Sequence, residues 1–161
     1  DAVMLAAAAG LLSAMRGDGA QPGYRVGRWL FLYGWAVFCG AAAWCQYPFD
    51  FPITAALTLA ALGVLAASDL AVPPVPMYII YGWAGGVYGL NAGGSMEGMD
   101  PKLILFMYVV DLALLALVFA GARALLLRFP KARIAARVAG SWITAIAMLQ
   151  FGWTLKMRSL Q

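Results

Sequence analysis

The stretch from Lys102 to Leu127 constrains the fold more than any other part of the chain, because apolar residues fill it almost without interruption. A helix rises about 1.5 Å per residue, so this stretch is long enough to cross a hydrocarbon layer roughly 30 Å thick. Asp111 lies near its middle and Arg123 in its last turn. The long stem of an arginine reaches the interface, whereas an aspartate at that depth does not. The stretch therefore predicts a membrane-spanning helix that carries a carboxyl group inside the membrane.

The composition of the whole chain supports lipid as its solvent. Of the 161 residues, 64% are hydrophobic and 11% are charged, and the mean hydropathy is +0.82. A soluble domain of this size needs a more polar exterior. The net charge of +4 comes from basic residues in short connectors between apolar runs, which is typical of topology determinants and argues against a nucleic-acid partner. We therefore expect the lipid bilayer to be the main partner of the chain.

Six apolar runs predict an all-α fold, a polytopic bundle of about six membrane-spanning helices that forms one domain over residues 1–161. The runs cover residues 1–15, 27–47, 53–72, 77–90, 102–127 and 138–155. The fourth run is short and rich in glycine, so a re-entrant segment is the alternative to a full crossing there. Basic residues gather in the connectors after the first and fifth runs. The positive-inside rule places those connectors on the cytoplasmic, matrix or stromal side of a bacterial inner membrane or an organellar membrane.

Asp111 is the first candidate for a functional residue. An ionisable group at mid-membrane costs about 2.5–3.5 kcal/mol on insertion scales, so it is expected to face other helices or a wet cavity. The short connector between the last two runs predicts that they pack antiparallel, which brings Asp111 to the depth of Gln150. An amide can donate to a carboxylate or accept from its protonated form, and Tyr108, one turn earlier, adds a hydroxyl. These three residues are predicted to form a proton- or cation-handling site in a pathway; a packing hydrogen bond that fixes helix register is the alternative.

Two more polar residues are candidates for the same pathway. Asp69 lies close to the end of the third run, which continues past it, and Asn91 lies at the end of the fourth. Transporters tend to place binding sites at short helical segments interrupted by glycine, as the fourth run is. Its small residues at helical spacing allow a neighbouring backbone to approach closely. The predicted helix-packing positions are Gly82, Gly85, Gly86 and Gly89.

A four-residue word, Tyr-Gly-Trp-Ala, occurs at residues 33–36 and again at residues 81–84, and residues 151–153 repeat it in part. All three copies fall on even-numbered runs, which point in the same direction in a six-span bundle. Repeated helical hairpins are common in transporters. Coincidence, in a chain this rich in glycine, alanine and aromatic residues, is the alternative explanation.

The scarcity of histidine and cysteine limits the kinds of catalytic and metal-binding site that the chain can form. The chain has no histidine and two cysteines, which excludes histidine-ligated haem, histidine-based zinc sites and Ser-His or Cys-His nucleophiles. Cys39 and Cys45 lie in one predicted helix, too far apart to bridge each other. We therefore expect no metal and no cofactor.

Three functions remain open. The preferred prediction is a transporter or channel for a small solute or ion, with Asp111 at the centre of its pathway. The second is a cofactor-free accessory or structural subunit of a larger membrane complex or a homo-oligomer. The third is an intramembrane acid catalyst, an isomerase or cyclase acting on an apolar lipid or isoprenoid. It requires Asp111 or Asp69 to face a closed cavity bounded by Trp35, Trp83 or Trp153.

Overall fold

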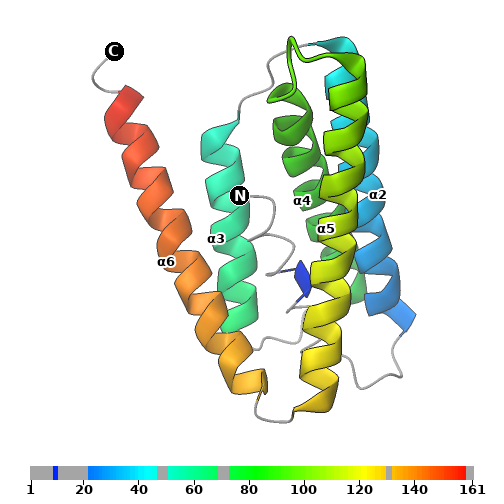
Figure 1. Cartoon of the computed structure of the whole chain (residues 1–161). Helices are drawn as coiled ribbons and strands as arrows, with labels where there is room; N and C mark the ends of the chain where they lie inside the picture. The colour runs from blue at the N-terminus through cyan, green and yellow to red at the C-terminus, as the bar shows by residue number, and fades with distance from the viewer. Residues whose placement is uncertain (1–8, 11–21, 47–50, 69–72, 130–131, 159–161) are drawn as a thin grey trace.

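A computed structural model describes residues 9–10, 22–46, 51–68, 73–129 and 132–158 of the chain (Figure 1). Its helices are α2 (Pro22–Cys45), α3 (Pro52–Ser68), α4 (Pro74–Gly94), α5 (Pro101–Arg128) and α6 (Ala132–Arg158). The described residues contain no strand. The predicted all-α fold is therefore confirmed.

The helix boundaries follow from residues that favour starting or ending a helix. A proline opens four of the five helices, at Pro22, Pro52, Pro74 and Pro101. Proline suits a first helical turn because its missing N–H would have no partner there and its φ angle already fits. At the start of α5, the Asp100 carboxylate accepts a hydrogen bond from the Lys102 N–H at 2.8 Å. Gly98 turns the chain before α5 with a φ of 74°, a conformation that glycine adopts without strain.

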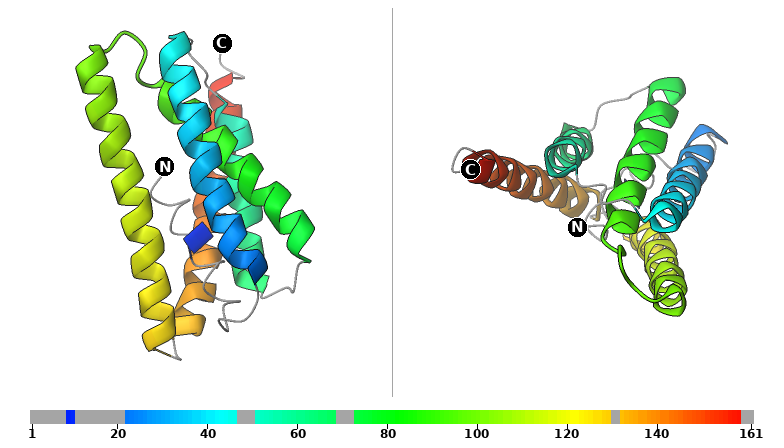
Figure 2. Two further views of the ribbon diagram at one scale, coloured as in Figure 1. Left: turned by 90° about the vertical axis from the view of Figure 1, so that its right-hand side faces the viewer. Right: turned by 90° about the horizontal axis from the view of Figure 1, so that it is seen from above.

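The helices pack mainly as two pairs, α2 with α4 and α3 with α6. Successive helices run in opposite directions, so α2 and α4 are parallel whereas α3 and α6 are antiparallel (Figures 1 and 2). Helix α5 lies against α2, where Phe119 meets Phe31 edge to face at 5.6 Å between ring centroids. Contact between the α3–α6 pair and the other three helices is slight. The chain thus forms two groups of helices, α2–α4–α5 and α3–α6.

Glycines bring the backbones of α2 and α4 together. A Cβ atom on Gly89 would lie 2.5 Å from the carbonyl oxygen of Trp35 and 3.0 Å from the Cys39 nitrogen. Gly85 and Gly93, one turn to either side, press in the same way on the carbonyl groups of Phe31 and Cys39. Small residues at this spacing let helix backbones approach closely enough for extensive van der Waals contact.

Glycines also bring the backbones of α3 and α6 close together, although fewer of them lie at this contact. A Cβ atom on Gly140 would lie 2.8 Å from the Ala66 Cβ and 2.9 Å from the Ala67 nitrogen. Gly63 lies against Gly140 and Thr144. At the other side of the contact, the Arg137 Nε donates a hydrogen bond to the Ala67 carbonyl at 3.3 Å.

Replacing Gly140 with alanine should lower the free energy of unfolding by about 1–3 kcal/mol, because the added methyl group overpacks the contact with α3. The Ala67 backbone cannot move aside without displacing its helix. Gly152→Ala, on the same helix, is the matched control, since its Cβ would meet no atom within 4 Å. Unfolding of the purified proteins in detergent, followed by circular dichroism, measures both changes; equal stability of the two variants would contradict the prediction.

Three helical segments are long and apolar enough to cross a membrane: Val26–Cys45, Pro101–Ala124 and Ile134–Met157. They correspond to the second, fifth and sixth predicted runs. The third run forms α3, which is apolar but has only 17 residues. The fourth run forms α4, an unbroken helix of 21 residues that extends beyond the predicted residues 77–90. The first run, residues 1–15, lies outside the described residues except at positions 9 and 10, so the structure supports three spans and does not establish six.

Candidate functional site

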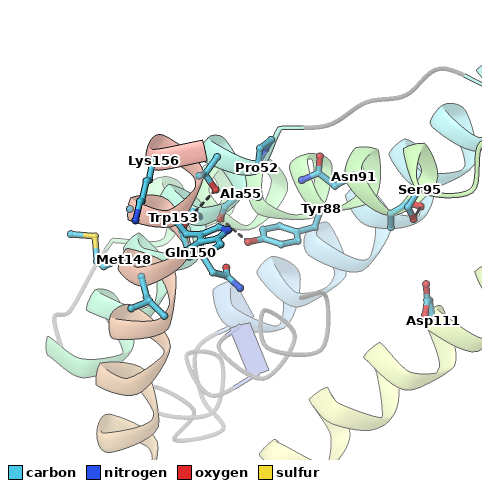
Figure 3. A pocket seen from close by; sticks show the side chains of 15 residues that line it. Pro52, Ala55, Tyr88, Asn91, Ser95, Asp111, Met148, Gln150, Trp153 and Lys156 are labelled. Carbon is cyan, nitrogen blue, oxygen red and sulfur yellow. Dashed lines mark hydrogen bonds between the residues drawn. The ribbon is translucent and has the colours of Figure 1, made fainter. Parts of the chain in front are cut away.

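An open cavity of about 1160 Å³ lies between the α3–α6 pair and the side of the bundle formed by α4 and α5 (Figure 3). All four of these helices contribute side chains to its wall. It exists because each helix pair is held together tightly by its own glycines while contact between the two groups is slight. Three of the predicted pathway residues line it: Asn91 from α4, Asp111 from α5 and Gln150 from α6.

Asp111 lies on the inward face of α5. Its neighbours along that face are the half-buried Ile104 and Tyr108 and the buried Leu115 and Phe119, spaced three or four residues apart as one side of a helix requires. The Asp111 side chain is itself half-buried. Its carboxylate makes no hydrogen bond or ion pair with another described residue. The helix therefore presents this carboxylate to the cavity, away from the exposed side of α5.

Gln150 does not meet Asp111 as predicted. The two side chains come from opposite walls of the cavity (Figure 3). Helices α5 and α6 run antiparallel, as expected from their short connector, but they hardly touch each other. The reason is that α6 packs on α3 through Gly140, while the inward face of α5 packs on α2.

Tyr108 also differs from the prediction, because it is not among the residues that line the cavity. Its ring stacks on Trp35 of α2, with 5.7 Å between centroids and 25° between planes. Its hydroxyl donates a hydrogen bond to the Ala36 carbonyl at 3.2 Å. Tyr108 thus joins α5 to α2 one turn from Asp111.

Asn91 lies where α4 meets the start of α3. Its Oδ1 accepts a hydrogen bond from the Phe51 N–H at 3.0 Å. Tyr88, one turn earlier on the same wall, donates from its hydroxyl to the Ala55 carbonyl at 2.6 Å. These bonds connect the two groups of helices beside the cavity. The remaining pathway candidate, Asp69, lies outside the described residues.

The four predicted packing glycines differ in how closely α2 approaches them. Gly85 and Gly89 lie directly against the backbone of α2. A Cβ on Gly86 would make ordinary contact with the Phe38 ring at 3.4 Å, and one on Gly82 would meet no atom within 4 Å. The α2–α4 contact therefore depends on the face that carries Gly85 and Gly89.

Several residues of the cavity were not predicted from the sequence. Tyr88 precedes Asn91 by one turn, while Thr154 and Lys156 follow Gln150 by one or two turns. Extending the helical spacing from the two predicted residues would have found Tyr88 and Thr154, because residues three or four apart share a helix face.

The charges of the cavity are few. Asp111 and Lys156 are the charged residues among those that line it, and they lie at opposite ends of the view in Figure 3. No group of three or more potential metal ligands occurs among the described residues. Comparison with known protein families, curated proteins and solved structures gives no match.

Proposed function

We propose that this chain is a multi-pass membrane protein that moves a small solute or ion, with the cavity as part of its pathway and Asp111 as the group that binds the cargo or its coupling proton. The observation that carries the proposal is the position of Asp111: a carboxylate in the middle of a long apolar helix opens into a cavity. An ionisable residue within a membrane helix is costly and usually marks a pathway or a proton relay.

Within the part of the chain that the structure describes, Asp111 has no hydrogen-bond partner, which favours this function over a role in packing. A residue that fixes helix register needs a hydrogen-bond partner on the neighbouring helix. The Asp111 carboxylate has none among the described residues, and Gln150 lies across the cavity. A carboxylate that bonds to none of the described residues is available to a cargo.

The arrangement of the helices supports movement around the cavity. Close glycine contacts make the α2–α4 and α3–α6 pairs compact, whereas the two groups share little contact. Alternating access in many transporters is the rocking of one such bundle against another around a fixed site. The cavity at the junction of the two groups is where such a site would lie.

The two alternative functions have less support. Many large apolar side chains of α5 are exposed, including Leu105, Phe106 and Leu117; these fit a lipid surface as well as a partner subunit. The acid catalyst needs a closed cavity walled by tryptophan. The observed cavity is open, and of the three tryptophans considered only Trp153 lines it.

Purified protein reconstituted into liposomes should conduct at least one of protons, Na⁺, K⁺ and choline faster than protein-free liposomes, and Asp111→Asn should return that flux to the protein-free rate. The substitution keeps the size of the side chain and removes its charge. Glu97→Gln is the matched control, because it makes the same chemical change at an exposed position in the α4–α5 connector.

A trapped pH dye reports proton flux, and isotope uptake reports the other cations. Retention of wild-type flux by Asp111→Asn would remove the carboxylate from the pathway. Wild-type flux no faster than that of protein-free liposomes for every cation in the panel would overturn the proposed transport function.

A further inference from the structure

We infer that the cavity binds an organic cation, specifically a protonated amine attached to an apolar body. This inference rests on the proposed function, since it names the class of cargo that the pathway would accept. It is carried by the juxtaposition of one carboxylate, a set of hydrogen-bond acceptors and an apolar wall around a space much larger than an ion.

The size of the cavity indicates an organic ligand. Sites for small organic molecules usually measure about 300–1,000 Å³, and this open cavity, at about 1160 Å³, is of comparable size. A bare metal cation is bound by oxygen atoms at about 2.0–2.6 Å, in a coordination shell of several ligands. No cluster of acidic residues that could provide such a shell occurs among the described residues.

The hydroxyl groups of the wall offer acceptors to a ligand. Three hydroxyl groups line it, and each has already given its proton to a backbone carbonyl: Ser95 to Ala92 at 2.7 Å, Tyr88 to Ala55 at 2.6 Å, and Thr154 to Gln150 at 2.8 Å. Their oxygen atoms still have lone pairs with which to accept hydrogen bonds. Together with the Asp111 carboxylate, they favour a ligand that donates hydrogen bonds and carries positive charge.

The wall formed by α6 suits the apolar part of such a ligand. Met148, Leu149 and Trp153 line the cavity there, and Met148 and Trp153 lie across the view from Asp111 (Figure 3). A ligand is therefore oriented with its amine toward α5 and its apolar body along α6, where the Trp153 indole provides a large contact surface.

Binding of three probes with the same eight-carbon chain tests this assignment: octylamine, which is protonated at pH 7, octanol and octanoate. Binding of each labelled probe to the full chain in phosphatidylcholine nanodiscs is measured by equilibrium dialysis, with empty nanodiscs subtracted. We expect octylamine to bind about tenfold or more tightly than octanol, as a charge-assisted hydrogen bond provides, and octanoate to bind least. Equal binding of octylamine and octanoate would overturn the inference.

Variants at Asp111 show whether this carboxylate sets the preference. Asp111→Asn should bind octylamine and octanol equally, whereas Asp111→Glu, which keeps the charge, and Glu97→Gln, which lies outside the cavity, should retain the wild-type preference. Size-exclusion chromatography confirms that each variant is folded. A preference for octylamine that survives in folded Asp111→Asn would contradict the assignment.

Two further measurements separate the possible outcomes. Addition of phosphatidylethanolamine to the nanodiscs should compete with octylamine if the amine comes from a lipid headgroup, and should leave its binding unchanged if the amine is a free solute; both results retain the amine as the ligand class. Selective octylamine binding without liposome flux of the four panel cations or of a labelled protonated amine would support the ligand class and reject transport. Cation flux without selective octylamine binding would support transport and reject the ligand class.

Discussion

Gly89→Leu should separate α4 from α2 and lower the free energy of unfolding by more than about 3 kcal/mol, beyond the usual cost of overpacking by a methylene or two. Even the first carbon of a side chain at this position would lie 2.5 Å from the Trp35 carbonyl oxygen. The carbonyl oxygen belongs to a helix backbone and the Cβ is fixed directly to one, so neither can turn away as the end of a flexible side chain would. The whole contact between the two helices must open to admit leucine.

Gly82→Leu is the matched control, because Gly82 belongs to the same helix and has no atom within 4 Å of its expected Cβ. Its free energy of unfolding should stay within about 1 kcal/mol of the wild type, because a side chain there meets open space. Leucine also has a higher helix propensity than glycine, by less than about 1 kcal/mol. Denaturant titrations in detergent, followed by helical circular dichroism, compare the two variants. If both variants lose the same stability, close approach of the backbones is not what holds α2 and α4 together.

Trp35→Ala should cost about 3–5 kcal/mol, the range measured for large aromatic residues removed from a packed core. Trp35 has no exposed surface and is the largest of the fully buried side chains. Its ring fills the space between α2 and α5 by stacking on Tyr108. Alanine would leave a void there, because the glycine contact with α4 prevents α2 from moving into it.

The sequence itself supplies the control for this prediction. Trp83 occupies the same position in the second copy of the four-residue word, but it is 60% exposed, so Trp83→Ala should change stability by less than about 1 kcal/mol. Trp35→Phe should keep most of the stability, since phenylalanine retains a ring against Tyr108 and removes a buried indole N–H that has no hydrogen-bond partner. A loss as large in Trp83→Ala as in Trp35→Ala would show that burial does not determine the cost.

Helix α5 could be predicted from the sequence nearly to its ends, because a long apolar run bounded by Pro101 and Arg128 allows few other structures. The end of α4 could not. Residues 91–94 are Asn-Ala-Gly-Gly, a composition typical of a loop, yet they continue the helix to Gly94. Gly93 explains this, since it packs on the Cys39 carbonyl of α2. A tertiary contact here overrides a weak local preference.

The choice of partner helices depends on information that no local pattern carries. A short connector predicts contact between α5 and α6, but α6 packs on α3 through Gly63 and Gly140. Gly63 is a single glycine within an alanine-rich run, and nothing near it in the sequence indicates its partner. The repeated word makes the same point: Trp35 is buried and Trp83 exposed, because burial depends on which side of each helix a neighbour occupies.

The candidate site was predictable in part for a simple reason. A carboxyl group within an apolar helix has few tolerable environments, so Asp111 could be singled out without knowledge of the fold. Its inward direction follows from its helical spacing to Leu115 and Phe119, which are both buried. The distance between Asp111 and Gln150 could not be foreseen, since it depends on α3 occupying the side of α6 that was expected to meet α5.

The order of the helices along the chain has a consequence for biosynthesis. Helix α2 packs on α4, and α3 packs on α6, so α2 and α3 each leave the ribosome before the partner that covers their small-residue surface has been made. The nascent chain must hold α3 beside an uncompleted bundle until α6 has been translated. A ribosome that stops within α6 would therefore release a chain in which α3 lacks its main contact, a species suited to recognition by quality-control proteases.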